Sequence, residues 1–379
     1  MWFRNLFLFR FDPKALGMTA SSLGDCLLEK RLRDVGAIEL CTTGFVSPYG
    51  RGSDELVQAT GDFALVALGT QERLLPSDVV AEELSSRVEA MAEKTGKKPG
   101  GRERKRIKEE IITDLLPRAF VRESRLLAYF DLARGWLVVN TASRKAAESV
   151  VMAVRDALGS FPCVPMAPEE SPRILMTDWL ARGQLPAGLI LGDECELRDP
   201  VEAGAIVRCK HQELETDEVR EHLKSGKQVY RTALTFNDRI SFVLSEDLVV
   251  RALRFLDVVQ DELGTAESQV AEFDAIFALQ TLELRELLGW IESTFQVSAA
   301  PALKLDGGDA PKHMRDAERL AADPRFLDAV GRLAPKGAGE SVTISARVDG
   351  KTSSVTLTAA DGVRLRRAAK TAKRMRGEA

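Results

Sequence analysis

The sequence predicts an α+β fold, because apolar stretches typical of strands alternate with segments of helical spacing, and short turns join several strands in pairs. The 379 residues allow roughly two to three domains of the usual 100–200 residues. With 45% hydrophobic and 29% charged residues, the composition is that of a globular protein and excludes a wholly disordered or fibrous chain. Only 6% of the residues are aromatic, so we expect mainly aliphatic cores.

The chain begins with a predicted strand. Trp2–Phe11 is rich in Leu and Phe with little polar alternation, which indicates a strand buried on both faces, and Pro13 ends it. The leucine spacing of Thr19–Arg33 predicts a helix. Phe63–Leu68, bounded by glycines, predicts a second strand.

A helical hairpin is expected over residues 77–116. Ser77 is the expected N-cap of a helix from Val79 to about Lys94, and a second helix, Arg102–Leu116, stops at Pro117. A Gly/Pro-rich turn separates the two helices, so they should pair antiparallel and can project from their domain.

Predicted strands and helices continue to alternate up to residue 297. The further strands expected are Leu126–Asp131, Trp136–Asn140, Ala187–Leu191, Ala205–Lys210, Val229–Phe236 and Arg239–Leu244. The further helices expected are Ala146–Leu158, Asp217–Ser225 and Phe273–Phe295. Turns at Arg134–Gly135 and Asn237–Asp238 predict that two of the strand pairs are hairpins.

The composition then shifts to Ala, Gly, Pro and Asp, which separates three parts of the chain. We expect a domain over residues 1–297, a linker over 298–340 and an extension over 341–379. In the extension, alternating residues on either side of Asp349–Gly350 predict a β-hairpin, and Val363–Arg376 forms a basic tail.

The location expected from the sequence is the cytoplasm. The first ten residues contain Arg4 and Arg10 and lack a cleavage site for a secretory signal. The longest uncharged run, Ala157–Pro168, is shorter than the roughly 18 residues needed to span a bilayer. Five scattered cysteines favour reduced thiols over a disulfide framework.

Charge is distributed very unevenly, although the net charge is only −4. Residues 246–297 hold eleven acidic residues against three arginines, whereas residues 363–376 hold seven basic residues and no acid. Residues 94–108 hold one acid and eight basic residues, here called the hairpin patch: Lys94, Lys97, Lys98, Arg102, Arg104, Lys105, Arg106 and Lys108.

The hairpin patch can neutralise a row of phosphates, which is the main source of DNA affinity without sequence preference. The alternative is a solvated helix surface, but few acids lie within the patch to pair with its cations. No aromatic residues are interleaved with them, so phosphate contact with duplex or single-stranded DNA fits better than base stacking.

No motif demands an enzyme. The sequence lacks a P-loop, a dinucleotide-binding glycine motif and a nucleophile elbow, and its three histidines are far apart. Asp193, Glu194, Glu196 and Asp199 could in principle hold Mg²⁺ for phosphodiester hydrolysis, but we expect them on a solvated turn. We therefore predict no catalytic residues, no metal site and no cofactor.

Several short blocks, in order along the chain, are typical of one family. They are Met1–Leu6 (MWFRNL), Leu115–Phe120 (LLPRAF), Leu158–Ser160, Met176–Trp179 (MTDW), Arg208–Leu214 (RCKHQEL), Arg254–Asp257 and Phe273–Ala275. On these blocks, residues 1 to about 297 resemble the bacterial recombination-associated RdgC family. Ordered matches over most of the chain are more specific than any single motif, but the extension is unlike typical members.

The resemblance implies a DNA-binding protein without sequence preference, folded as an α+β horseshoe with a projecting helical hairpin. Two subunits would pair into a ring dimer whose basic hole admits double-stranded DNA. Members of the family limit access of the RecA recombinase to DNA. The implied protein is therefore a nucleoid-associated homodimer that regulates recombination.

The family's pattern also implies roles for individual residues. Phe120 would be the gate residue that inserts into an apolar pocket of the other subunit, with Arg118 beside it facing DNA or that interface. Gln212, with Lys210 and His211, would lie at the hinge, and we expect Arg118, Lys210 and Gln212 to contact DNA. The alternatives are a core aromatic for Phe120 and a surface strand residue for Gln212. His211 stands where relatives should have lysine, so a phosphate contact there would be weaker and pH-dependent.

Three functions stay open at this point. The leading hypothesis is a non-enzymatic, ring-forming DNA-binding dimer. The second is a metal-dependent exonuclease acting in recombination, a label that proteins of the family sometimes carry. The third is an interaction protein whose acidic C-terminal half binds a recombination factor.

Overall fold

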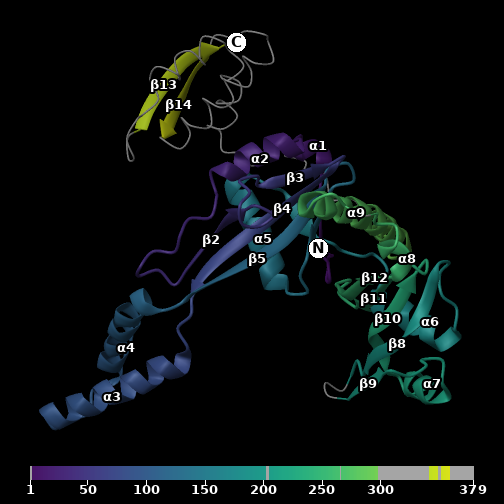
Figure 1. The fold of residues 1–379 in the computed structure, drawn as a ribbon, viewed down its shortest axis with the longest axis horizontal. Helices are drawn as coiled ribbons and strands as arrows, with labels where there is room; N and C mark the ends of the chain where they lie inside the picture. Colours follow the sequence, from purple (N-terminus) through teal and green to yellow (C-terminus); the bar gives the residue numbers. More distant parts are fainter. Residues whose placement is uncertain (1, 202–204, 265, 298–340, 349–350, 359–379) are drawn as a thin grey trace. The chain divides into compact units, whose positions relative to one another are not determined.

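The computed structural model describes residues 2–201, 205–264, 266–297, 341–348 and 351–358. The chain divides into two compact units, Met1–Ala302 and Leu303–Ala379. The first unit is mixed α+β, with two antiparallel sheets (Figure 1). The α+β class predicted from the sequence is confirmed.

The elements follow in chain order. The strands are β1 (Phe7–Phe11), β2 (Cys41–Val46), β3 (Val57–Thr60), β4 (Phe63–Arg73), β5 (Val121–Asp131), β6 (Trp136–Val139), β7 (Cys163–Pro165), β8 (Leu189–Arg198), β9 (Ile206–Lys210), β10 (Gln228–Phe236), β11 (Ile240–Ser245), β12 (Val250–Phe255), β13 (Ser341–Val348) and β14 (Lys351–Thr358). The helices are α1 (Pro13–Leu16), α2 (Ala20–Leu28), α3 (Ser77–Thr95), α4 (Gly101–Leu115), the 3₁₀ helix η1 (Leu116–Arg118), α5 (Arg144–Leu158), α6 (Pro172–Arg182), α7 (Asp217–Lys224), α8 (Asp257–Gln260) and α9 (Gln269–Thr294).

Much of the first sheet is buried on both faces. Its order is β2-β4-β5-β6-β1-β7, with β3 also paired to β4. Successive residues of a strand point to opposite faces, so Leu127 and Tyr129 of β5 enter one core while Ala128 and Phe130 enter another. Helices α2 and α5 cover the second of these cores and α9 covers the first. This two-sided burial explains why β1 is apolar except for Arg10, which is buried and pairs with Glu292 at 2.8 Å.

The second sheet is apolar on one face only. Its order is β12-β11-β10-β8-β9. Thr232, Leu234 and Phe236 of β10 are buried, while the residues between them are partly exposed. The buried face joins the same core as α6, α7 and α9. Helix α9 therefore shares one core with both sheets.

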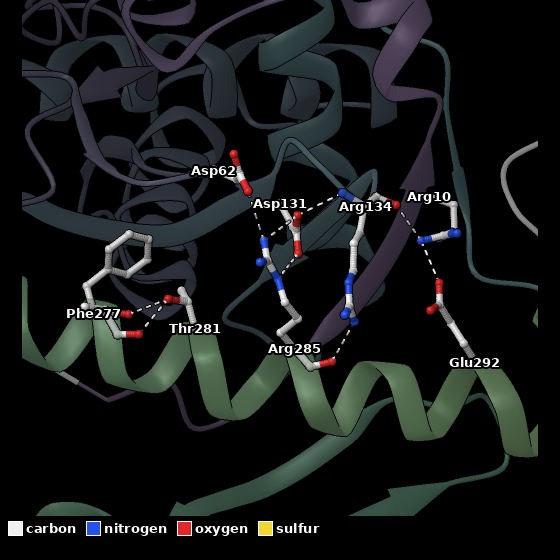
Figure 2. Close-up of polar contacts among 9 residues, drawn as sticks. Arg10, Asp62, Asp131, Arg134, Phe277, Thr281, Arg285 and Glu292 are labelled. Carbon is white, nitrogen blue, oxygen red and sulfur yellow. Dashed lines mark hydrogen bonds and ion pairs between the residues drawn. The ribbon is translucent and has the colours of Figure 1, made fainter. Parts of the chain in front are cut away.

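The bond between Asp131 and Arg285 ties α9 to the first sheet (Figure 2). Two guanidinium nitrogens of Arg285 donate to the Asp131 carboxylate at 2.9 and 3.0 Å, and the Arg134 backbone N–H donates to it at 2.9 Å. The Asp131 side chain is 1% exposed, and the Arg285 guanidinium also lies 4.1 Å from the Phe63 ring centroid. A bidentate pair of this kind fixes orientation as well as adding energy.

Some element boundaries differ from those predicted. The first strand begins at Phe7 because the residues before it run beside β12, where the Leu6 N–H donates to the Val250 carbonyl at 2.8 Å. Ser77 is not the N-cap, because α3 already begins there and Pro76 takes the cap position without a side-chain bond. Several elements were not predicted from the sequence: α1, β2, β3, β7, α6, β12 and α8.

In the second unit, β13 and β14 pair antiparallel from Ser341 opposite Thr358 to Val348 opposite Lys351. This is the hairpin expected on either side of residues 349–350. The predicted linker, 298–340, and the basic tail, 363–376, lie outside the described residues.

Among the described residues, no helix combines the length and the apolar character needed to cross a membrane. The cysteines Cys26, Cys41, Cys163, Cys195 and Cys209 are all free. Burial raises the pKa of the Cys195 thiol to about 12, and its neighbour Cys209, directly opposite on β9, acts in the same direction.

We predict that Arg285→Met lowers the free energy of unfolding by about 3 kcal/mol, because it leaves the buried Asp131 carboxylate without its hydrogen-bonded counter-charge. Chemical denaturation measures the change. Adding Asp131→Asn to this variant should recover part of the loss. Arg144→Met, which removes an exposed pair with Glu148, is the control and should cost less than about 1 kcal/mol. Equal losses in the two single variants would contradict the role given to Arg285.

Candidate nucleic-acid interface

Helices α3 and α4 form a hairpin with a small core of its own. Val80 of α3 and Ile107 and Ile111 of α4 are buried together, apart from the cores of the two sheets. The turn begins at Gly96, whose φ of 71° suits glycine and whose N–H donates to the Ala92 carbonyl at 2.8 Å. Because so few apolar residues are needed inside, most of the hairpin surface is free to carry charge.

All eight cations of the hairpin patch are exposed. Lys105 and Arg106 each reach a glutamate one turn further along α4, at 4.0 and 3.3 Å. The other six have no ion pair within the described part of the chain: Lys94, Lys97, Lys98, Arg102, Arg104 and Lys108. Exposed i,i+4 pairs are weak, so the patch remains strongly positive towards solvent.

Phe120 lies between η1 and β5, and its side chain is 84% exposed. Its carbonyl accepts the N–H of Leu74 at 2.8 Å, which places it beside the end of β4. Leu74 and Val121 are also exposed, and so is Arg118, two residues before Phe120. The alternative that Phe120 is a core aromatic is wrong.

Lys210, His211 and Gln212 are exposed and mark the end of β9. Lys210 pairs with Glu194 at 3.3 Å, and Nδ1 of His211 lies 3.1 Å from a carboxylate oxygen of Asp193. Gln212 follows the strand rather than lying in it, so the alternative of a strand residue is wrong. Its backbone N–H donates to the Asp193 carbonyl at 3.4 Å.

Three of the four acids considered for a metal site lie in a strand rather than on a turn, and the fourth, Asp199, directly follows that strand. Asp193, Glu194 and Glu196 belong to β8, where Glu196 alternates with the buried Cys195 and Leu197. A glycine before these acids and a proline after them suggested a turn, but the cross-strand partners on β9 and β10 extend the strand through them.

Glu196 is itself buried and holds three arginines. Burial opposes its ionisation, yet hydrogen bonds from Arg198 and Arg208, at 2.7 and 3.0 Å, keep the pKa of Glu196 below its usual value. Arg231 lies 3.9 Å away. Sequence reasoning did not single out these arginines, although each occupies a strand position that alternates with buried residues.

The donor set therefore offers little to a metal ion. In β8, Asp193, Glu194 and Glu196 are each engaged by a basic side chain. Within the described ranges, no group of three or more His, Cys, Asp or Glu side chains is arranged to hold one. The charged features of this unit are suited to binding an anionic polymer, with cations presented on a helical hairpin and a sheet.

Comparisons with known proteins agree on one family. The family model described as "Putative exonuclease, RdgC" matches residues 1–298. Proteins named "Recombination-associated protein RdgC" are 46% identical over 305 residues in Xanthomonas campestris pv. campestris, covering 80% of this chain and 100% of theirs. The protein of that name from Xylella fastidiosa is 47% identical over 303 residues, covering 79% and 99%. The chain belongs to the RdgC family of recombination-associated proteins.

Proposed function

We propose that this protein binds DNA through its phosphates, without sequence preference, and modulates homologous recombination. The observation that carries the proposal is the hairpin patch, in which eight exposed cations share one helical hairpin. Cations in such number release counterions when they meet phosphates, and this gives affinity for any sequence. The names of the relatives support the role in recombination.

The proposal extends to the assembly. Two horseshoe-shaped subunits pair into a ring dimer around double-stranded DNA, and the protein also contacts single strands. The bound ring limits access of RecA to the DNA and associates with the nucleoid. A closed ring turns weak phosphate contacts into persistent binding, since a threaded duplex leaves only when an interface opens.

Phe120 and Gln212 are the residues proposed for the two contacts of the ring. An 84% exposed phenylalanine gains most from burial in a partner's pocket, by roughly 2 kcal/mol or more, which supports Phe120 as the gate. Gln212, with Lys210 and His211, is exposed at the end of β9, as a hinge contact requires. Arg118, beside the gate, is free to face DNA.

The description of the family model favours a second function, an exonuclease that acts in recombination. Hydrolysis by that route would use carboxylates and a divalent ion, but Asp193, Glu194 and Glu196 are held by basic side chains. We therefore propose a protein without catalytic residues, resident metal or cofactor. Robust Mg²⁺-dependent release of nucleotides from linear duplex DNA would overturn this part of the proposal.

We predict that replacing Lys97, Lys98, Arg104 and Lys105 with glutamate weakens binding to unrelated duplex sequences alike, at least tenfold at 0.1 M salt. The slope of log affinity against log salt should also fall by about three to four, because each phosphate contact adds about 0.9. Fluorescence anisotropy at several salt concentrations measures both quantities.

The control variant replaces four exposed cations outside the hairpin patch with glutamate: Lys14, Arg144, Lys145 and Arg155. Its affinity for duplex DNA should stay within about twofold of that of the unmodified protein. Equal losses in the two variants, or salt-independent binding by the unmodified protein, would contradict the phosphate-binding role of the hairpin patch.

We predict that Phe120→Ser leaves the subunit folded but weakens self-association at least tenfold. The side chain is exposed in the single chain, so its loss should change the free energy of unfolding by less than about 0.5 kcal/mol. Sedimentation over a range of concentrations measures the assembly. Met152→Ser, which removes another exposed apolar side chain, is the control. A fully stable dimer of the Phe120 variant would refute the gate assignment.

A further inference from the structure

One face of the second sheet has no helix packed on it among the described residues. The other face joins α6, α7 and α9 in a single core. Directly opposed residues in an antiparallel pair share a face, and so do residues two apart on one strand. The register of the sheet therefore tells which side chains lie together on the uncovered face.

A row of polar residues crosses four of the five strands. From β9 through β8 and β10 to β11, the opposed residues are Arg208, Glu196, Arg231 and Ser245. Their neighbours along the strands, such as Cys195 and Cys209, are buried in the core. The row therefore lies on the face away from the helices.

The fifth strand continues the same face. On β11, Ser241 and Val243 alternate with buried residues and share the face of Ser245. Their partners on β12 are Arg254 and Arg251, respectively. The Arg251 guanidinium donates to the Ser245 hydroxyl at 3.0 Å, which links β12 to the polar row.

Every basic residue in the strands of this sheet lies on the uncovered face. We call the set the basic sheet face: Arg198, Arg208, Lys210, Arg231, Arg251 and Arg254. By the same register, two acids of the described strands β8–β12 lie there, Glu194 and Glu196. The excess of four positive charges stands out in a chain whose net charge is −4.

The acids on this face do not neutralise its cations. Glu196 is shared by Arg198, Arg208 and Arg231, at 2.5, 3.0 and 3.9 Å. The side chains of Arg208 and Arg231 remain 62% and 40% exposed, so the carboxylate positions them without hiding them. Arg254 is exposed and has no ion pair among the described residues.

We propose that the basic sheet face is a second DNA-binding surface, which takes the phosphate backbone of duplex DNA independently of the hairpin patch. The inference rests on the proposed DNA-binding function and adds where the duplex lies. Five strands spaced about 4.8 Å apart make a face roughly 19 Å wide, and a duplex carries about eleven charges over that length. Short residues such as Ser241 and Ala233 lie between the arginines and let a backbone approach them.

A duplex fits this face better than a single strand does. Non-specific single-strand binding uses exposed aromatic rings on which bases stack. Near this face, Tyr230 is half-buried and its ring already faces the guanidinium groups of Arg198 and Arg173, at 4.8 and 5.4 Å. No other aromatic residue of the described strands β8–β12 shares the register of the basic sheet face. Apart from Arg198, the guanidinium groups of this face lie over no aromatic ring of the described residues, and such groups are suited to phosphates.

The test uses the full chain with Arg251→Gln and Arg254→Gln combined. Binding of a fluorescent linear duplex is measured between 50 and 200 mM salt. The affinity at 0.1 M salt should fall about tenfold, and the salt slope should fall by about two, since two phosphate contacts are lost. Restoring the charge with Arg251→Lys and Arg254→Lys should recover most of the affinity.

The matched control is Arg220→Gln with Lys224→Gln, which removes the same charge from α7 on the covered side of the sheet. It should bind within about twofold of the unmodified protein, and thermal unfolding checks that both variants are folded. If the unmodified protein binds duplex and the two glutamine variants bind equally well, the sheet-face inference fails and the proposed function stands. If the unmodified protein binds no duplex, both fail.

Discussion

The structure of the first unit depends on α9, which supplies one helix to a core shared by both sheets. The apolar face of this helix, with Leu284, Leu287, Leu288 and Ile291 buried, binds the two sheets to a common interior. The Asp131–Arg285 pair fixes how the helix lies on the first sheet. A buried ion pair adds little net stability, but it is costly to break, so it specifies one docking of the helix.

This arrangement decides where polar side chains can lie. Helices α2 and α5 cover the remaining face of the first sheet, so most of its strand positions between the two cores are apolar. The second sheet has helices on one face only, so the strand positions that point away from them can carry arginines. The hairpin of α3 and α4 can carry charge for a different reason. Its core consists of a few residues, so the rest of its surface can hold lysine and arginine. Two basic surfaces thus arise from the packing of two different elements.

Much of the fold could be predicted from local patterns. The long helices, the β10–β11 hairpin and the hairpin patch are contiguous in the sequence, so periodicity and charge counts reveal them. Short strands such as β2 and β3 were missed because their residues pack against β4, which no local pattern records. Arg208 and Arg254 lie far apart in the sequence, and only the register of the sheet brings them to one face.

The candidate site, too, could be predicted only in part from local sequence patterns. Aromatic residues are usually buried, so the residue type alone predicted a buried Phe120. Phe120 is exposed, and only the family resemblance indicated this. The acids of β8 were assigned to a turn because Gly192 and Pro200 bound them, although Cys195 and Leu197 alternate with Glu194 and Glu196 as in a half-buried strand. The strand pairing of β8 with β9 and β10 agrees with this alternation and not with the flanking Gly and Pro.

The most direct measurement of the central proposal compares release from circular and linear duplex DNA of the same length and sequence. Protein is bound at low salt, the salt is raised, and the fraction retained is followed over time. A closed ring predicts slow release from the circle and fast release from the linear molecule, whose free ends let the ring slide off, with cutting of the circle causing prompt release. Equal rates from the two forms would contradict encirclement and leave an open, one-sided contact.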